Sequence, residues 1–151
     1  MGAFAGFDMP LTYKGVNAEH LCVREHVGVF DVSHMGEFMV SGDAALDLLQ
    51  YTTSNDVAAL AIGAAQYGYM PNENGGVVDD LLIYRLEEKK YMLVVNASNM
   101  DKDWHWLNEQ NNSFGATLTN ASADYALLAV QGPKAHKLMC ELTEIDTAAQ
   151  K

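Results

Sequence analysis

The sequence has the length and composition of one ordinary folded domain. It comprises 151 residues, of which 49% are hydrophobic, and that proportion is sufficient to build a buried core. Twenty acidic residues against nine basic ones leave a formal charge of −11, with no cluster of Lys or Arg to offset it. This balance argues against nucleic acid and anionic membranes as partners. No run of about 18 uncharged apolar residues is present, which argues against a membrane-spanning helix.

The amino-terminal residues and the cysteines bear on processing and compartment. Residues 1–10 are apolar but lack a basic n-region and a cleavage-site pattern, so we predict folded structure there and not a signal peptide. Cys22 and Cys140 lie far apart and form no metal or redox spacing. We expect both to be reduced core thiols, as in a cytoplasmic protein.

Helices and strands both occur in the first part of the chain. A short helix is predicted at residues 18–26 with Gly28 as its stop, and residues 27–32 are assigned to loop and turn. A strand at 36–40 precedes a helix at 43–51. The apolar positions of this second helix that should point inward are Ala45, Leu48 and Leu49.

The clearest local signal is a hairpin. Residues 66–70 and 77–86 have the composition of strands, and Asn74 and Gly75 between them suit the positive φ angles of a tight turn. A charged turn then leads to a third strand at 91–96. We predict an antiparallel meander of these three strands.

The last third of the chain continues in the same mixed manner. We expect a helix at about 99–109 capped by Ser98, strands at 116–120 and 125–131, and a helix opened by Pro133. The buried stripes of the two helices should comprise Met100, Trp104 and Leu107, and then Ala135, Leu138, Met139 and Leu142. Because no βαβ regularity is visible, the predicted class is α+β, with antiparallel sheet and packed helices in one continuous segment.

Two adjacent aspartates are the most distinctive chemical feature. Side chains alternate along a strand, so Asp79 points to one face while Asp80 shares the other with Leu82 and Tyr84. The pair therefore cannot work as the two facing carboxylates of a glycosidase. A carboxylate in so apolar a strand costs free energy unless it is partnered or hydrated in a cleft. The alternative, that both aspartates are simply wet at the hairpin mouth, stays open.

Residues on the neighbouring strands could join this site. Antiparallel pairing should bring Asn96 near Leu81 and Asp80, where its amide offers a donor and an acceptor to a heteroaromatic ring. The alternative for Asn96 is a local role at the entry to the next helix. Tyr67 and Tyr69 share a face of the preceding strand, although an aromatic residue in a sheet more often belongs to the core.

Other reaction types find little support in the sequence. Asp31, Ser33 and His34 lie close together, but no nucleophile elbow accompanies them, so a hydrolase triad is not predicted. His34 is expected to be a hydrogen-bonding scaffold residue. The histidines show no metal-ligand spacing, and the chain has neither a phosphate loop nor a dinucleotide fingerprint.

Six blocks of sequence occur in an order that resembles one known family. They are FAGFDMP at 4–10, VREHVGVFDVSHMGE at 23–37, TSNDV at 53–57, NENGGVVDDL at 72–81, VVNA at 94–97 and VQGP at 130–133. Together they cover nearly the whole chain and resemble the T protein of the glycine cleavage system, a tetrahydrofolate-dependent aminomethyltransferase.

The resemblance implies a reaction and a set of residues. A one-carbon unit on the lipoylated H protein would pass to tetrahydrofolate with release of ammonia, without a metal, in the cytoplasm or, in a eukaryotic source, the mitochondrion. The essential carboxylate would be Asp80. The folate-binding positions would be Met35, Tyr67, Asp80, Leu82, Tyr84, Val94 and Asn96. Because family members are more than twice as long, the chain would be an amino-terminal folate-binding region of 1–151 that lacks the later domains.

Two related readings share the implied fold. One is the folate-binding portion of a dimethylglycine or sarcosine oxidase or of a folate-dependent demethylase, which would need a flavin domain or a different substrate pocket. The other is a non-catalytic folate-binding module of the iron–sulfur-maintenance type. The intact GGVVDD run at 75–80 favours the aminomethyltransferase over this module.

Overall fold

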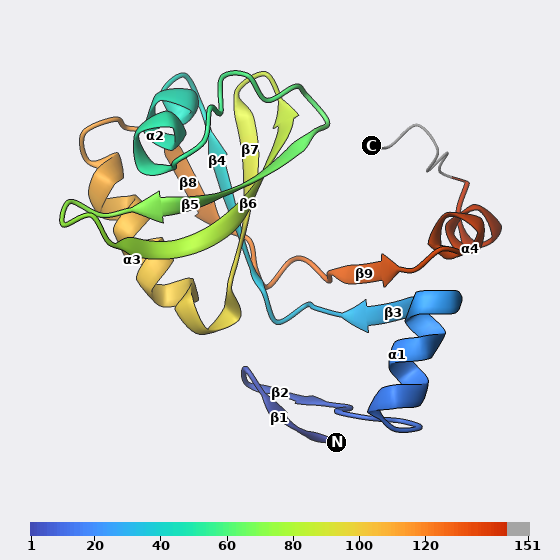
Figure 1. Ribbon diagram of the computed structural model, residues 1–151. Coiled ribbons are helices and arrows are strands. Elements are labelled where there is room, and N and C mark those ends of the chain that lie inside the picture. Colours follow the sequence, from blue (N-terminus) through green and yellow to red (C-terminus); the bar gives the residue numbers. More distant parts are fainter. Residues whose placement is uncertain (145–151) are drawn as a thin grey trace. The chain divides into compact units, whose positions relative to one another are not determined.

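The computed structural model describes residues 1–144, which divide into two compact units (Figure 1). Among these residues, one unit combines 1–34 with 126–144, and the other comprises 35–125. Both units contain helices together with antiparallel strands, so the predicted α+β class is confirmed.

The second unit is built on a five-stranded antiparallel sheet with the order β5-β6-β7-β4-β8. Its strands are β4 (Gly36–Ser41), β5 (Ala65–Pro71), β6 (Val77–Glu87), β7 (Lys90–Val95) and β8 (Thr117–Asn120). The predicted meander is confirmed as β5-β6-β7, with Leu82 paired to both Tyr67 and Val94. Strand β4 then adds beside β7, which places Gly36 opposite Val95.

Helices α2 (Ala45–Thr52) and α3 (Met100–Asn111) supply the core on one face of this sheet. The side chains of β6 alternate between this buried face and the opposite one. Leu81 and Ile83 are at most 2% exposed, whereas Leu82 and Tyr84 on the opposite face are only half-buried. The predicted inward residues of α2 are all fully buried. The common core consists of Phe38, Val40, Ala45, Leu48, Leu49, Val57, Leu60, Met70, Leu81, Ile83, Tyr91, Leu93, Val95, Leu107 and Ala116.

The turn between β5 and β6 follows the predicted hairpin chemistry. Gly75 has a φ of 77°, a conformation that residues with a Cβ adopt rarely. The Asn72 side-chain oxygen accepts hydrogen bonds from the backbone N–H groups of Asn74 at 3.0 Å and Gly76 at 2.9 Å. This rigid turn fixes the register of β6, and therefore the faces to which its two aspartates point.

The first unit has short elements and little buried surface. A hairpin of β1 (Gly2–Phe4) and β2 (Phe7–Met9) precedes α1 (Val16–Glu25), and β3 (Gly28–Asp31) pairs with β9 (Leu128–Gln131) ahead of α4 (Ala135–Leu142). The assignment of residues 27–32 to loop and turn is therefore wrong. Residues 28–31 form strand β3 because they pair with β9, about 100 residues later in the chain, and local sequence patterns do not reveal such a distant partner.

Close backbone approach explains one glycine of this unit. Gly132 has a φ of 122°, and a Cβ built there would lie 2.5 Å from the carbonyl oxygen of Val23. The chain can therefore pass the end of α1 at this point only with glycine. Lys134 then donates its backbone N–H to the carbonyl of His26 at 2.9 Å, which ties the start of α4 to the end of α1.

Several smaller predictions are corrected. Ser98 does not cap the long helix, because it lies in the 3₁₀ turn η1 (Ala97–Asn99) and α3 begins after Asn99. Cys22 and Cys140 are exposed, so the prediction that they are core thiols is wrong. The same holds for α4, whose predicted stripe contains no fully buried residue, because residues 1–34 and 126–144 form no deep core for the helices to enter.

Candidate carboxylate site on the antiparallel sheet

The two aspartates of β6 lie on opposite faces of the sheet, as predicted. Asp79 is 7% exposed and belongs to the face covered by α3, while Asp80 is half-buried on the other face with Leu82 and Tyr84. Register places Leu81 opposite Val95, so the next residue, Asn96, falls beside Asp80.

The Asp80 carboxylate is held by two side-chain donors. The Tyr67 hydroxyl donates to Oδ2 at 2.9 Å, and the Asn96 amide donates to Oδ1 at 3.0 Å. The same amide nitrogen lies 3.2 Å from the Asp80 backbone carbonyl. Asp80 is therefore a partnered carboxylate and not merely a wet residue at the hairpin mouth.

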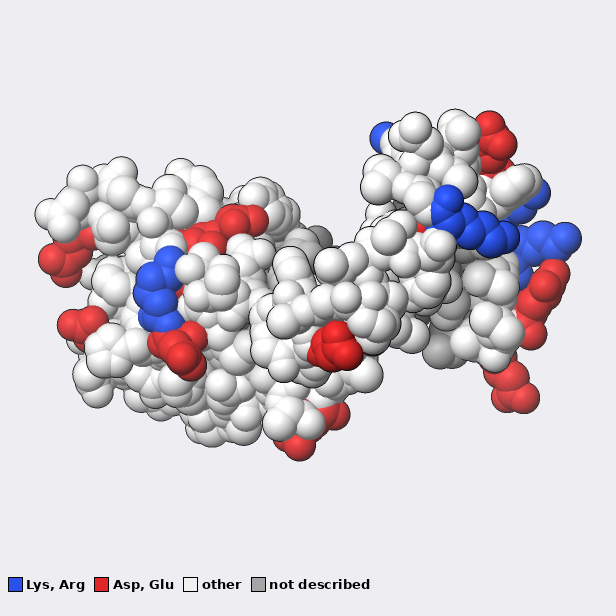
Figure 2. Space-filling view, turned by 90° about the horizontal axis from the view of Figure 1, so that it is seen from below, with Lys and Arg blue, Asp and Glu red and all other residues white. Residues whose placement is uncertain are grey.

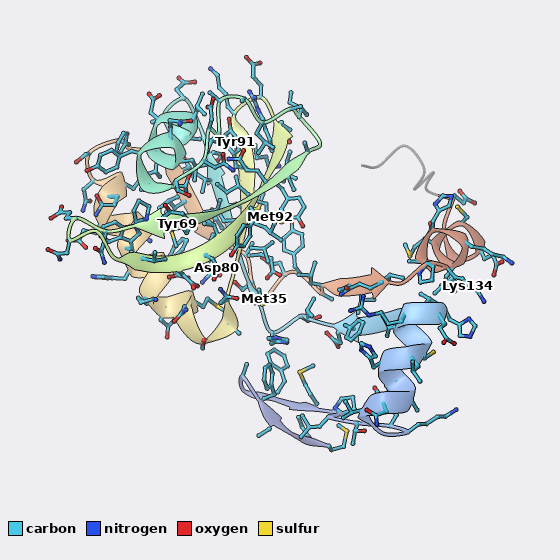
Figure 3. All side chains as sticks on the ribbon, in the orientation of Figure 1. Met35, Tyr69, Asp80, Tyr91, Met92 and Lys134 are labelled. Atoms are coloured by element: carbon cyan, nitrogen blue, oxygen red, sulfur yellow. The ribbon has the colours of Figure 1, made fainter. Side chains whose placement is uncertain are left out.

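The tyrosines of β5 are on the surface and not in the core. Tyr67 is 62% exposed and Tyr69 is 45% exposed, so the core alternative is wrong for both. Tyr69 pairs with Asp80 across the sheet, and both lie at the same end of it in Figure 3. The hydrogen bond that Tyr67 donates to Asp80, together with burial and the aspartate charges, raises the pKa of this phenol above its ordinary value.

The remaining predicted positions form an apolar surface around Asp80. Leu82 lies between Tyr67 and Val94 in the pairing register, and Tyr84 lies opposite Met92 in the next row. Met35 immediately precedes β4 and lies toward the same end of the sheet as Asp80 in Figure 3. The structure thus brings together all seven predicted positions: Met35, Tyr67, Asp80, Leu82, Tyr84, Val94 and Asn96.

A buried carboxylate beneath the site was not predicted. Asp103 of α3 is 0% exposed, and neither of its carboxylate oxygens accepts a hydrogen bond from the described residues. The helical pattern contained a usable signal, because position 103 follows Met100 by three and precedes Leu107 by four, which places it on the inward stripe.

The buried pair of Asp79 and Asp103 has divergent acidities. Burial, then the hydrogen bond with Asp79 and the negative charge of Asp79, raise the pKa of Asp103 to about 7, against a partial offset from Lys102. Burial would also raise the pKa of Asp79, but hydrogen bonds from Asp103, Asn96 and Asn99 outweigh it and leave that pKa below its ordinary value. The Asn96 amide nitrogen lies 3.1 and 3.2 Å from the two Asp79 oxygens.

Glu37 is a second carboxylate that sequence reasoning missed. It pairs with Val94 in the register of β4 and β7, is 1% exposed, and has no hydrogen-bond partner for either carboxylate oxygen among the described residues. Burial raises its pKa above the ordinary value. A single Glu in an otherwise apolar strand gave no periodic signal for this position.

The neighbouring serine and histidine do not form a catalytic triad. The Ser33 hydroxyl accepts the backbone N–H of Leu127 at 3.0 Å, and its own N–H donates to Asp31 at 3.0 Å, so the serine stabilises backbone. His34 contacts the ring of Phe4 edge-on, with centroids 5.0 Å apart. The His34 Nδ1 atom is buried and makes no hydrogen bond to the described part of the chain. The prediction of a scaffold hydrogen bond is therefore wrong for this ring nitrogen.

On the face in Figure 2 much of the surface is uncharged, and acidic and basic side chains stand singly or in small groups. Within the described residues, no set of three His, Cys, Asp or Glu side chains is placed to hold a metal ion. None of the helices in that range is long and apolar enough to cross a membrane.

Comparisons with known proteins agree with this architecture. A model of the GCVT N-terminal domain matches residues 1–151. The aminomethyltransferase of Flavobacterium psychrophilum is 56% identical over 146 residues, which are 97% of this chain and 40% of that protein. An aminomethyltransferase of Bacteroides fragilis is 57% identical over 148 residues, 98% of this chain and 41% of that protein. The crystal structure of glycine cleavage system aminomethyltransferase T from Bartonella henselae superposes with a TM-score of 0.86 at 42% identity, covering 93% of this chain and 38% of that one.

These matches place the chain in the class of aminomethyltransferase-type α+β domains, as the resemblance implied. It belongs to the GCVT N-terminal domain family. The chain spans about two fifths of the length of the curated relatives that it matches.

Proposed function

We propose that this chain is the amino-terminal, folate-binding part of a tetrahydrofolate-dependent aminomethyltransferase of the glycine cleavage system. In this proposal the whole protein transfers the one-carbon unit from the aminomethyl-dihydrolipoyl group of the H protein to tetrahydrofolate and releases ammonia. The observation that carries the proposal is the Asp80 carboxylate, held by Tyr67 and Asn96 at the edge of an apolar sheet surface.

The geometry suits a carboxylate that receives hydrogen bonds from a ligand ring. Each carboxylate oxygen has two lone-pair positions, and here Tyr67 occupies one on Oδ2 while Asn96 occupies one on Oδ1. One position on each oxygen is left for N–H donors of a pterin. Because its position is fixed in this way, the Asp80 carboxylate can also support proton movement near the reactive nitrogens of the pterin. Its negative charge can stabilise an iminium-like cation that develops during transfer.

The surface around Asp80 supports the same proposal. A planar heteroaromatic ring needs an apolar wall beside its hydrogen-bonding edge, and Leu82, Tyr84 and Val94 provide one on adjacent strands. The curated relatives compared above are aminomethyltransferases, which favours this activity over the oxidase, demethylase and non-catalytic alternatives. The two cysteines form no metal or redox spacing, which suits a reducing compartment, and we propose a cytoplasmic location, or a mitochondrial one in a eukaryotic source.

Calorimetric titration of the chain with tetrahydrofolate tests the proposal. We expect binding by the unmodified chain and its loss or marked weakening in Asp80→Asn, which keeps the shape of the side chain but removes its charge. Asp47→Asn on the exposed side of α2 is the matched control and should bind as the unmodified chain does. Equal affinity of Asp80→Asn and the control would refute the role of Asp80.

A further inference from the structure

The carboxyl pair beneath the site has no part in the function proposed so far. Asp103 comes from α3 and Asp79 from β6, and they are 0% and 7% exposed. The Lys102 ammonium lies 3.9 Å from Asp103 Oδ1, too far for a hydrogen bond, and it donates to the Val78 carbonyl instead. Asp103 is thus left without a donor among the described residues, and the Asp79 carboxyl group is its neighbour.

Two adjacent carboxylates cannot both stay ionised in so dry a place, so the pair must hold a proton. The charged groups that act on Asp103 are Asp79 and, from the other face of the sheet, Asp80 of β6, together with Lys102 of its own helix, and their net charge is negative. The neighbouring groups are two neutral amides, Asn96 directly after β7 and Asn99 at the end of η1. These amides donate to Asp79 and none donates to Asp103, so the proton belongs on Asp103.

We propose that Asp103 is a positioning residue: as a neutral carboxylic acid it donates a hydrogen bond to Asp79, and Asp79 in turn fixes the Asn96 amide against Asp80. The inference deepens the proposed function, and its relevance to transfer rests on the role assigned there to Asp80. It adds a residue on the far face of the sheet that positions the Asp80 carboxylate through Asp79 and Asn96.

The Asn96 side chain is the link between the two faces. Its amide nitrogen lies within 3.0–3.2 Å of oxygens from both aspartates, so its two hydrogens are directed toward β6. The carbonyl end of the same amide therefore points away from both carboxylates, where it can accept a hydrogen bond from a ligand. Ionisation of Asp103 would place a second negative charge beneath Asp79, draw the amide toward the pair and loosen its hydrogen bond to Asp80.

Carboxyl and amide NMR of the whole 151-residue chain between pH 5 and 9, without folate, tests this arrangement. We expect one aspartate carboxyl carbon to titrate near pH 7, and the Asn96 side-chain amide to shift with the same midpoint. Asp103→Asn should remove that carboxyl titration and hold the Asn96 amide at its low-pH position, because an amide mimics the neutral acid. Asp47→Asn should leave both titrations unchanged.

The outcomes separate this inference from the proposed function. Ionisation of Asp103 in the ordinary acid range, or an Asn96 amide that stays fixed while Asp103 titrates, would overturn the inference whatever Asp80 does. Undiminished tetrahydrofolate binding by Asp80→Asn would overturn the proposed function and leave the NMR result standing. Rescue gives a further readout: at pH 6 the melting temperature of Asp103→Asn should equal or exceed that of the unmodified chain, whereas Asp103→Leu should lower it.

Discussion

Replacement of Asp103 by Asn should change how stability depends on pH. The folded-state pKa of Asp103 is about 7 against an ordinary value of 3.8. A raised pKa means that the folded state retains a proton that the unfolded chain releases. The stability linked to this proton is fully present below about pH 4 and is lost as pH rises through 7.

The size of this effect follows from the shift. One pKa unit corresponds to about 1.4 kcal/mol, so a shift of roughly three units removes at most about 4 kcal/mol across this window. The lowered pKa of Asp79 acts with the opposite sign, since its stabilisation is lost only as pH falls through the acid range. Asn at position 103 cannot ionise, so the variant should lack the loss of stability between pH 4 and 8.

Urea unfolding of the unmodified chain and of Asp103→Asn at several pH values measures the difference. Tryptophan fluorescence is a suitable signal, because Trp104 and Trp106 are the only tryptophans and both lie on α3. The free energies of unfolding should be similar near pH 4, and by pH 8 the variant should be the more stable by about 2–4 kcal/mol. Parallel pH profiles for the two proteins would refute the protonated state of Asp103.

Three further substitutions test the site and the two units. Tyr67→Phe removes a donor to Asp80 and should weaken tetrahydrofolate binding roughly tenfold in calorimetry, with an unchanged melting temperature; unchanged affinity would contradict the role of this hydroxyl. Leu48→Ala should lower the free energy of unfolding in urea by about 2–5 kcal/mol, and a cost well under 1 kcal/mol would contradict the assigned core. Gly132→Ala forces a Cβ toward the Val23 carbonyl and should speed amide hydrogen exchange in β3 and β9; unaltered exchange would contradict the close approach.

Sequence patterns predicted the second unit well because its elements are defined locally. The turn at Asn74 and Gly75 fixes the hairpin, and the alternation along β6 assigns Asp79 and Asp80 to opposite faces. The antiparallel register then follows from the short turns, and it places Asn96 beside Asp80. Residue spacing alone did not show whether Asp80 is hydrated or partnered. The hydrogen bonds from Tyr67 and Asn96 show that it is partnered.

The features that escaped prediction depend on distant partners. Strand β3 is extended because β9 lies beside it, and nothing in its own four residues requires a strand. Asp103 occupies an inward helical position, but its importance arises from Asp79, which is 24 residues earlier in the chain and on another element. The helices of the first unit carry apolar stripes that the described residues leave without a deep core, so periodicity overestimated their burial.

The role of Asp80 is tested most directly by the affinity of the chain for tetrahydrofolate with and without its charge. A hydrogen bond to a charged group contributes about 1.5–3 kcal/mol to the free energy of binding. We therefore expect Asp80→Asn to bind tetrahydrofolate at least roughly tenfold more weakly than Asp47→Asn, as measured by calorimetry at neutral pH. The same affinity in both variants, with both correctly folded, would contradict the assignment of Asp80 as the folate-binding carboxylate.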